Sequence, residues 1–359
     1  MIELSVVVPT YNEKANIGPL VERLQIALAG IEWEVIFVDD DSPDGTADTV
    51  RQVSNTNPRV RCIQRIGRRG LSSACVEGML SSAAPYCAVM DADLQHDEAI
   101  LPQMLHLVSS QQCDIAVGSR YVEGGGTGDW DSARAGISSF ATRIAQQLTG
   151  TQIADVMSGF FLLRRESVEP ALRQVSGLGF KILLDIVLRA DRNLTVKEVP
   201  YTFKSRVAGD SKFDIQAAWQ FCMMFADHYI GNFIPVRFLS FILIGGSGVL
   251  VHLLVLTLSF QSLGASFLFS QGLATLVAMT SNFALNNALT YSDKRLRGMA
   301  ALKGWFTFCV ACGLGAVANV GVANYLFVQE FAWLGSATVG ILLGAVWNYA
   351  ITSAYTWKN

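Results

Sequence analysis

The first part of the chain alternates short apolar runs with longer stretches in which apolar residues recur at helical spacing. Runs of about four to eight apolar residues bounded by turn residues are typical of buried strands, and the longer period is typical of amphipathic helices. Alternation of the two indicates βαβ units and a mainly parallel sheet. We therefore predict strands at 4–8, 35–38, 60–63, 86–90 and 115–117, and helices near 14–29, 46–54, 71–82 and 98–109.

The pattern and the composition both change near residue 235. Residues 236–359 hold only 6 of the 27 Lys and Arg and 2 of the 30 Asp and Glu. Four apolar segments there are each longer than the roughly 20 residues that a helix needs to cross a bilayer. We predict membrane-spanning helices near 236–260, 267–291, 304–328 and 333–356, after an α/β domain over 1–212 and a linker over 213–235.

The loops between these segments predict their orientation. The second loop carries Lys294, Arg295, Arg297 and Lys303, whereas the first has no charged residue and the third has only Glu330. Because short basic loops stay in the cytoplasm, we expect both termini and the α/β domain to lie there. The α/β domain has no basic stripe, which argues against nucleic acid as a partner.

An internal repeat is visible in the apolar part. Residues 281–291 match 347–357 at a spacing of 66. At a spacing of 67, Phe238, Phe241, Gly246 and Gly248 match Trp305, Phe308, Gly313 and Gly315. We predict two duplicated hairpins around a pseudo-two-fold axis along the membrane normal. The glycines would permit close helix contact, and Asn282 and Asn348 would form interhelical hydrogen bonds.

Two further stretches, 136–148 and 213–233, have the pattern of amphipathic helices with aromatic residues. Such helices can lie in a membrane interface, but ordinary core helices show a similar apolar stripe. The first stretch fits both interpretations equally. The second runs directly into a predicted membrane span, which favours attachment at the interface.

Two carboxylates stand directly after the fourth predicted strand, in the stretch Val-Met-Asp-Ala-Asp-Leu-Gln-His at 89–96. Asp91 and Asp93 lie at the carboxyl end of this strand, where open α/β sheets bind ligands. Like charges this close need compensation, and hard divalent cations such as Mg²⁺ or Mn²⁺ take oxygen ligands. The alternative is a solvated loop whose carboxylates cap the next helix. His96 fits best as a residue at the start of that helix.

Polar loops also follow the first three strands. Residues 9–13 are Pro-Thr-Tyr-Asn-Glu, and residues 39–46 are Asp-Asp-Asp-Ser-Pro-Asp-Gly-Thr. One of these aspartates can bond a base or a ribose hydroxyl, while Ser42 and Asp44 also suit a turn that caps the next helix. Residues 65–74 form a glycine-containing basic loop whose N–H groups and arginines suit a diphosphate.

Taken together and in this order, the motifs PTYNE, VDDDSPDGT, RRGLSSA and DADLQH resemble those of a known enzyme family. It is the family 2 inverting glycosyltransferases of GT-A fold, specifically the polyprenyl-phosphate sugar synthases of the dolichyl-phosphate mannose synthase type. The resemblance covers roughly residues 4–215 and continues through Ser119-Arg120-Tyr121, Gly124-Gly125, Arg134, DVMSGF at 155–160 and RVAGDSK at 206–212. It implies an α/β, Rossmann-like GT-A catalytic domain with a mainly parallel sheet. The apolar part resembles the all-α, four-helix GtrA-type transmembrane domain.

The resemblance also implies roles for individual residues. The cofactor would be Mn²⁺ or Mg²⁺, held by Asp91, Asp93 and Gln95. The acceptor phosphate would be held by Arg120, Arg134 and Ser138. The donor nucleotide sugar would contact Pro9, Tyr11, Asn12, Glu13, Val38, Asp40, Arg69, Gly70, Asp91, Ala92, Arg206, Ser211 and Lys212. Catalysis would depend on Asp93, Arg120, Arg134, Asp155, Arg206 and Lys212.

The chemistry of a lipid-phosphate acceptor fits such a set of residues. Its second pKa lies at about 6, so its oxygen is largely ionised at neutral pH and needs no general base. Arginines can align this oxygen for in-line attack on the sugar C1 while a metal stabilises the leaving diphosphate. We therefore predict that Asp155 orients other groups and does not remove a proton. The structural alternative is an ion pair of Asp155 with Arg164 or Arg165.

The expected reaction is metal-dependent, inverting transfer of one hexose from a nucleotide sugar to a polyprenyl phosphate, either dolichyl or undecaprenyl, at the cytoplasmic membrane face. The stretches SGFFLLRRE and RVAGDSK resemble those of the mannose synthases most, which favours mannose from GDP-mannose, and UDP-glucose is the alternative donor. A translocator of lipid-linked sugars with a sensor domain is disfavoured by the intact DADLQ motif and the lack of intramembrane charges. The expected partners are the nucleotide sugar, the lipid and the membrane, and a homo-oligomer is compatible with the sequence.

Overall fold

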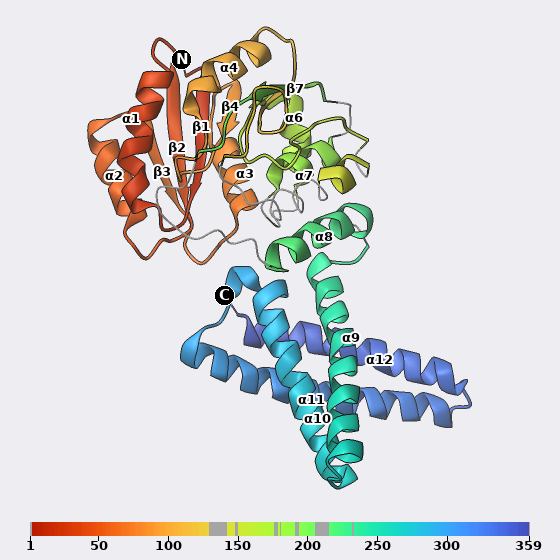
Figure 1. Cartoon of the computed structure of the whole chain (residues 1–359). Coiled ribbons are helices and arrows are strands. Elements are labelled where there is room, and N and C mark those ends of the chain that lie inside the picture. Colours follow the sequence, from red (N-terminus) through yellow and green to blue (C-terminus); the bar gives the residue numbers. More distant parts are fainter. Residues whose placement is uncertain are drawn as a thin grey trace. The chain divides into compact units, whose positions relative to one another are not determined.

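The computed structural model describes residues 2–128, 142–147, 150–175, 179, 181–190, 194–204, 215–231 and 233–358. It divides into two compact units, Met1–His228 and Tyr229–Asn359 (Figure 1). The boundary falls inside the stretch 213–235 that we expected to be a linker. The first unit combines strands and helices, and the described part of the second is helical.

The described residues of the first unit form a seven-stranded sheet in the order β3-β2-β1-β4-β6-β5-β7. The strands are β1 (Leu4–Thr10), β2 (Trp33–Asp39), β3 (Val60–Gln64), β4 (Tyr86–Val89), β5 (Ile115–Ser119), β6 (Phe161–Arg164) and β7 (Val196–Pro200). β1 to β4 pair in parallel, β6 is antiparallel to both β4 and β5, and β7 is parallel to β5. The predicted mainly parallel sheet is confirmed. The carboxyl ends of β1, β2, β4 and β5 therefore share one edge.

Helices cover both faces of this sheet. They are α1 (Ile17–Ala27), α2 (Thr46–Thr56), α3 (Leu71–Ser81), α4 (Leu101–Ser109), α6 (Arg165–Leu172) and α7 (Ile182–Arg189). The first unit also contains most of α8 (Ile215–Ile230) and the 3₁₀ turns η1 (Lys14–Asn16) and η2 (Glu98–Ile100). Successive side chains of a strand point to opposite faces. Val6 and Val8 of β1 accordingly pack in a core with α1, α2 and α4, and Val7 packs in a second core with α3, α6 and α7.

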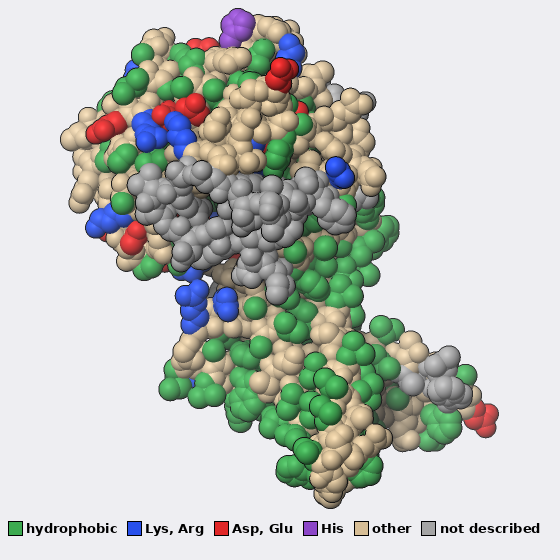
Figure 2. All heavy atoms as spheres, in the orientation of Figure 1, with side chains coloured by type: hydrophobic (Ala, Val, Ile, Leu, Met, Phe, Trp, Pro, Cys, Tyr) green, Lys and Arg blue, Asp and Glu red, His purple; other side chains and the backbone are tan. Residues whose placement is uncertain are grey.

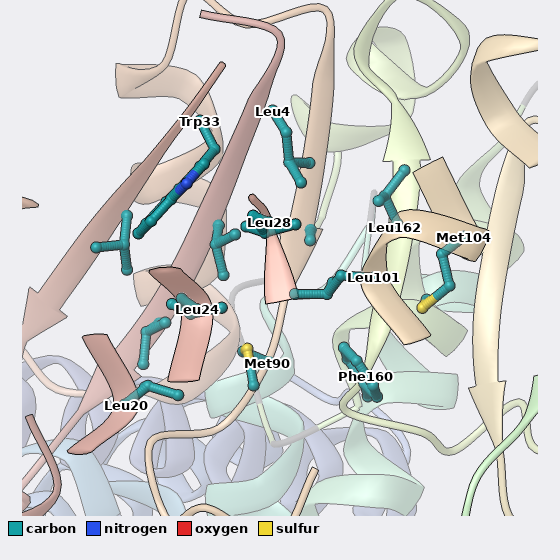
Figure 3. Close-up of a cluster of buried hydrophobic side chains, with 14 of the residues drawn as sticks. Leu4, Leu20, Leu24, Leu28, Trp33, Met90, Leu101, Met104, Phe160 and Leu162 are labelled. Atoms are coloured by element: carbon teal, nitrogen blue, oxygen red, sulfur yellow. The ribbon is translucent and has the colours of Figure 1, made fainter. Parts of the chain in front are cut away.

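The first of these cores fixes the strands whose ends carry the polar loops. Leu20 and Leu24 of α1 pack with Trp33 at the start of β2, and Met90 and Phe160 lie in the same cluster (Figure 3). All five side chains are buried. Burial on both faces explains why these strands read as continuous apolar runs, and it holds the loops that follow them on a rigid base.

α8 contributes to the core of the first unit. Its Met224 and Phe225 are buried in a cluster with Val156 and with Leu184 of α7. The Arg189 guanidinium of α7 also pairs with Asp227 of α8. One face of the predicted amphipathic helix is thus a core face, and attachment of its other face to a membrane stays a prediction. The other predicted amphipathic helix spans 136–148. Only its residues 142–147 lie within the described part of the chain, and these are helical.

The second unit is a membrane domain. Its described helices are α9 (Val236–Thr257), α10 (Phe267–Leu285), α11 (Gly298–Val328) and α12 (Trp333–Ile351), with π-helical turns η3 (Leu258–Ser262), η4 (Asn286–Thr290) and η6 (Thr352–Thr356) and the 3₁₀ turn η5 (Ser292–Lys294). Within the described residues three segments are long and apolar enough to span a bilayer: Val236–Ser262, Phe267–Thr290 and Gly298–Val328. Figure 2 shows hydrophobic side chains spread over the surface of this unit, as expected of helices that face lipid.

The two halves of the membrane domain repeat each other's contacts. Tyr291 stacks on Trp357, its counterpart 66 residues later, with ring centroids 4.1 Å apart and planes at 6°. The Tyr291 hydroxyl lies 2.6 Å from Ser353 Oγ, and Trp357 Nε1 donates to Asn287 Oδ1 at 3.1 Å. At the spacing of 66, Tyr291 corresponds to Trp357 and Asn287 corresponds to Ser353. Exchanging the two repeats therefore converts the Tyr291–Ser353 pair into the Trp357–Asn287 pair. This reciprocity is the signature of a pseudo-two-fold axis that passes beside the stacked rings.

Other contacts of the repeats follow the same relation. The ring pairs Phe241–Tyr349 and Phe283–Phe308 have centroids 5.7 and 5.8 Å apart. The hydroxyl pairs Ser240–Thr290 and Thr307–Thr356 lie at 2.6 and 3.1 Å. The turns η4 and η6 also stand at equivalent positions, so even a local departure from α-helical geometry is duplicated.

Each repeat packs an asparagine against a glycine of the preceding helix. A Cβ atom on Gly248 would collide with the Asn282 amide, and one on Gly315 would collide with Asn348 Oδ1. The predicted close approach at these glycines is confirmed. The prediction that the two asparagines make interhelical hydrogen bonds is wrong for their Oδ1 atoms, which are buried without a hydrogen-bond partner in the described part of the chain. For these Oδ1 atoms, the contact with the glycines is one of steric fit.

This packing predicts different effects for neighbouring glycines. We expect Gly315→Ala to lower the stability of the membrane domain by about 1–3 kcal/mol, because the new methyl group overpacks the contact with Asn348. Gly313→Ala is the matched control, because a Cβ there would meet nothing within 4 Å. Thermal unfolding of the purified protein in detergent measures both variants. Equal destabilisation by the two substitutions would contradict the steric explanation.

Candidate active site

The loops that follow β1 and β2 are joined by hydrogen bonds. Asn12 N donates to Ser42 Oγ at 3.0 Å, and Glu13 N donates to Thr46 Oγ1 at 3.0 Å. Asp44, which precedes the N-cap residue Gly45 of α2, accepts from Thr46 N at 3.0 Å, as expected for the turn predicted before this helix. Burial alone would raise the pKa of Asp44, but bonds from Thr46 and from the Lys14 N–H outweigh it and lower that pKa. The two loops therefore form one preorganised wall.

Each aspartate in the run 39–41 accepts at least one hydrogen bond, that of Asp41 coming from Gln64 Nε2 at 2.8 Å. Asp39 is fully buried and accepts from Thr10 Oγ1 at 3.2 Å and from Ser42 N at 2.9 Å. Asp40 accepts from Arg65 Nε and from Gly70 N, both at 2.7 Å. Burial raises the pKa of Asp40, while the Gly70 N–H and Arg65 act in the opposite direction. Its position near the predicted nucleotide cradle is fixed by these two partners.

One arginine of the basic loop differs from our expectation that the loop's arginines bind a diphosphate. Arg65 is only 1% exposed, and besides Asp40 its guanidinium donates to Ser73 Oγ and to the Gly70 carbonyl, each at 2.8 Å. Arg65 therefore holds the loop in place through buried hydrogen bonds and cannot reach a ligand. The prediction that it helps to bind a diphosphate is wrong for this residue. The Arg68 guanidinium pairs with Glu77 at 3.1 Å.

The remaining arginine of the loop, Arg69, lies over the ring of Tyr11 at 4.5 Å from its centroid. This contact brings together two residues predicted to bind the donor, from the loops after β3 and β1. Tyr11 is 40% exposed, so the pair is accessible. Pro9 and Val38 are neighbours in the β1–β2 register, and the Val38 side chain is fully buried in the core. Only the main chain of Val38 can contribute to a binding surface.

The segment 91–95 turns back on itself after β4. Leu94 has a φ of 62°, and Gln95 N donates to Asp93 Oδ1 at 3.2 Å. Gln95 Nε2 donates to the Lys204 carbonyl at 2.9 Å, and Lys204 N donates to the Gln95 carbonyl at 3.1 Å. The side chain of Asp91 is 38% exposed, whereas Asp93 is 9% exposed. The turn thus presents two carboxylates of different accessibility and is anchored to the segment after β7.

This donor set fits a hard divalent cation. In the part of the chain that the structure describes, no group of three or more His, Cys, Asp or Glu side chains is placed to hold a metal. Asp91 and Asp93 can supply two carboxylates, and the Oε1 atom of Gln95 can add a third oxygen. Mg²⁺ and ions like it are commonly held by one or two carboxylates and fill their other positions with water and substrate phosphate oxygens. A small, partly open carboxylate pair suits that arrangement.

A buried ion pair stands after β5. Asp155 is fully buried, and its two oxygens accept from Arg120 Nε and Nη2, both at 2.8 Å. Burial alone would lower the pKa of Arg120, but the bonds and charge of Asp155 outweigh it and raise that pKa, so the guanidinium stays charged. Glu198 of β7 in turn accepts from the N–H of Asp155 at 2.9 Å.

The pairing of Asp155 with Arg120 overturns the alternative that placed Arg164 or Arg165 beside it. Arg164 donates to the Val108 carbonyl at 2.8 Å, and Arg165 donates to the Ser82 carbonyl. Asp155 therefore orients an arginine that was itself predicted to bind the acceptor phosphate. The guanidinium of Arg120 also lies 5.5 Å from the ring centroid of Phe203, which borders the segment held by Gln95.

Both units match described families. Residues 5–171 match glycosyl transferase family 2, and residues 240–357 match the GtrA/DPMS transmembrane domain. The dolichol-phosphate mannosyltransferase of Pyrococcus furiosus is 34% identical over 360 residues, which cover 100% of this chain and 100% of that protein. The chain belongs to this family. It is a glycosyltransferase with a GT-A-type catalytic domain and a membrane domain, as the sequence motifs predicted.

Other relatives match a shorter part of the chain. The dolichol-phosphate mannosyltransferase of Saccharomyces cerevisiae is 36% identical over 241 residues, which cover 65% of this chain and 89% of the yeast protein. That of Mycosarcoma maydis is 35% identical over 250 residues, which cover 67% and 84%. Among solved structures, glucosyl-3-phosphoglycerate synthase of Mycobacterium tuberculosis matches 63% of this chain and 80% of its own, with a TM-score of 0.48 and 14% identity.

Several predicted site residues of this family member lie outside the described part of the chain. They are Arg134, Ser138, Arg206, Ser211 and Lys212. The described residues among the predicted set lie at the carboxyl edge of the sheet, either at the ends of β1 and β2 or in the segments that follow β1 to β5. This is the edge at which open α/β sheets bind ligands.

Sequence reasoning missed the role of His96, which we expected only to start a helix. Its ring is 3% exposed, and Nδ1 accepts from the main-chain N–H of Asp91 at 3.1 Å. Burial lowers the pKa of His96 to about 4, so the ring is neutral at physiological pH and carries its hydrogen on Nε2. Its position directly after the DADLQ motif was the one signal in the sequence that could have pointed to it.

Proposed function

We propose that this protein transfers one mannose from GDP-mannose to a polyprenyl phosphate, with inversion at the sugar C1 and dependence on a divalent metal. The curated relatives that it resembles are dolichol-phosphate mannosyltransferases, one of them over its full length. One observation of the site carries the proposal. The carboxylates Asp91 and Asp93 share a sheet edge with an arginine, Arg120, that a buried carboxylate holds in a bidentate pair.

The acceptor chemistry explains why the site needs a positioned arginine more than a base. A lipid phosphate with a second pKa at about 6 is already ionised at neutral pH. Its oxygen attacks C1, the bond between C1 and the diphosphate oxygen breaks, and the nucleoside diphosphate leaves with the bonding electrons. Both oxygens of Asp155 are occupied by Arg120, so Asp155 acts by orientation. Arg134 and Ser138 would hold the same phosphate.

The residues that would bind the donor nucleotide sugar lie mainly on the loops after β1 to β4. A bound divalent cation would neutralise the charge that develops on the leaving diphosphate. Asp91, Asp93 and Gln95 would hold the cation, while the Tyr11–Arg69 pair and the wall formed by Asn12, Glu13 and Asp40 would line the nucleotide. Arg206, Ser211 and Lys212 would add positive charge and hydrogen bonds to the diphosphate.

We further propose four membrane spans with both termini and the catalytic unit in the cytoplasm. α12 would be the fourth span, beside the three segments named above. Asp293 in the loop after α10 is paired with Arg237 at 2.6 Å. Lys294, Arg295 and Arg297 then leave the loop with net positive charge, which favours the cytoplasmic side. Nucleotide sugars are made in that compartment, so the orientation fits the proposed donor.

A reconstituted assay tests the proposal. We expect the full-length protein, in vesicles with polyprenyl phosphate, Mn²⁺ and radiolabelled GDP-mannose, to form a mannosylated lipid and GDP in equal amounts. Chelation of the metal with EDTA should stop the reaction, and Mn²⁺ should restore it. Parallel assays with UDP-glucose test the alternative donor. A glucosylated lipid with no mannosylated one would replace mannose by glucose, and no glycolipid from any donor would contradict the enzymatic function.

The same vesicles test the rival function of a translocator. A translocator would move a preformed lipid-linked sugar across the bilayer without consuming a nucleotide sugar. Movement of that lipid in the absence of GDP-mannose, with no transfer in its presence, would favour this second function.

A further inference from the structure

The His96 ring is fixed by aromatic side chains from two other segments of the chain. It stacks on Phe160 with centroids 5.0 Å apart and planes at 11°. The rings of Tyr201 and Phe203, which follow β7, make T-shaped contacts with it, and their centroids lie 5.9 and 5.8 Å from its own. A buried ring held on several sides keeps one orientation, so the direction in which Nδ1 points is set by residues far from it in sequence.

The other end of this arrangement is Asp91. His96 Nδ1 accepts from the Asp91 N–H, and its Nε2 lies 3.8 Å from Asp91 Oδ2. A Cβ on Gly159 would stand 3.5 Å from Asp91 Oδ2 and 3.8 Å from His96 Cε1. The Asp91 carboxylate therefore occupies a corner bounded by the edge of the imidazole and by the main chain at Gly159.

We propose that His96 is a positioning residue that holds Asp91 in the orientation needed to bind the divalent cation. The inference rests on the proposed function, in which Asp91 is a metal ligand. The side chain of Asp91 is 38% exposed, and a fixed main chain at this position limits the directions that its carboxylate can take. A ligand that is already oriented loses less conformational freedom when the cation binds, and partners behind metal ligands commonly change metal affinity by about 10- to 100-fold.

A purely structural role for His96 would rest on ring packing, and two substitutions separate that role from the proposed one. His96→Asn keeps an acceptor atom near the position of Nδ1 but removes the ring. His96→Phe keeps an aromatic ring in the cluster with Phe160 and removes the acceptor, which leaves the Asp91 N–H without its partner. The first variant should mainly affect stability, and the second should mainly affect the metal site.

Direct metal binding gives the decisive measurement. Full-length wild-type protein and both variants, purified in detergent with GDP, are titrated with Mn²⁺ while free Mn²⁺ is followed by electron paramagnetic resonance. We expect His96→Phe to bind Mn²⁺ roughly 10- to 100-fold more weakly than wild type and to melt slightly below it, because the ring packing persists while one main-chain N–H loses its partner. We expect His96→Asn to bind Mn²⁺ more tightly than His96→Phe while melting at a lower temperature.

Two results would overturn the inference. Wild-type affinity in His96→Phe, or weaker binding by His96→Asn than by His96→Phe, would mean that only the ring matters. Failure of the wild-type protein itself to bind Mn²⁺ in the presence of GDP would instead remove the metal from the proposed function. That failure is visible before any variant is measured. The KM for polyprenyl phosphate should stay within about twofold in both variants, because the hydrogen bond of His96 is made to Asp91, on the donor side of the site.

Discussion

Replacement of Asp155 by alanine is expected to lower both stability and mannose transfer. The Arg120 side chain is 9% exposed, and the variant leaves its guanidinium without the carboxylate that accepts two of its hydrogen bonds. Removing one partner of a buried ion pair typically costs about 3–5 kcal/mol, because the other charge stays buried. Thermal unfolding of the purified protein in detergent measures this loss.

The activity effect is best isolated with Asp155→Asn, which keeps the size of the side chain and loses its charge. We expect kcat/KM for polyprenyl phosphate to fall on the order of 10²-fold, because a misplaced guanidinium no longer aligns the attacking phosphate. The KM for GDP-mannose should change little. The control is Asp227→Asn, which removes a carboxylate from Arg189 at a distance from the sheet edge and should alter stability alone.

The pH profile distinguishes this role from general-base catalysis. If Asp155 orients Arg120, the pH dependence of kcat/KM keeps its shape in Asp155→Asn and only its height falls. If Asp155 removed a proton, the variant would lose the limb of the profile that reports the ionisation of the base. Loss of that limb would therefore contradict the orienting role.

The pattern of apolar runs was sufficient to predict the strands that helices connect in sequence. β1 to β5 were all predicted, because each is a short apolar run next to a helical stretch: the first four are followed by one, and the fifth comes after one. β6 and β7 were missed for physical reasons. β6 is a four-residue run that pairs with β4, more than seventy residues earlier, and β7 reads Val-Lys-Glu-Val-Pro, with too few apolar residues for a buried strand. Both owe their conformation to pairing with distant strands.

The same limit applies to the site. The position of Asp91 and Asp93 at the end of a strand was enough to predict a ligand-binding edge. The partner of a charged residue was not predictable, because it depends on which strands are neighbours. Arg65 and Asp40 meet because β2 and β3 lie side by side, and Arg120 and Asp155 meet across 35 residues.

His96 shows a third kind of limit. The left-handed conformation of Leu94, at a φ of 62°, turns the chain so that the imidazole returns to the main chain of Asp91. Non-glycine residues rarely adopt this conformation, and leucine gives no local reason to expect it. The contact follows from the packing of the whole turn against Phe160 and the segment after β7, which only the folded chain contains.

The largest effect on transfer is expected from Asp93→Asn. The substitution keeps the size of the side chain and an oxygen that can accept from Gln95 N, so the turn at 91–95 should persist. It removes one of the two negative charges available to a divalent cation. A bound metal contributes several kcal/mol of charge stabilisation in the transition state, and each loss of about 1.4 kcal/mol is tenfold in rate. We therefore expect kcat/KM to fall roughly 10³-fold, together with loss of Mn²⁺ binding.

Asp41→Asn is the matched control for this experiment. Asp41 stands at the same edge of the sheet, on the loop after β2, and has a φ of 56°, a conformation that asparagine adopts readily. The substitution removes the same charge without touching the turn at 91–95, so activity should stay within a few-fold of wild type. Undiminished glycolipid from Asp93→Asn would exclude Asp93 from the metal site. Equal losses in both variants would mean that the edge needs negative charge in general, and that no single carboxylate there binds the cation.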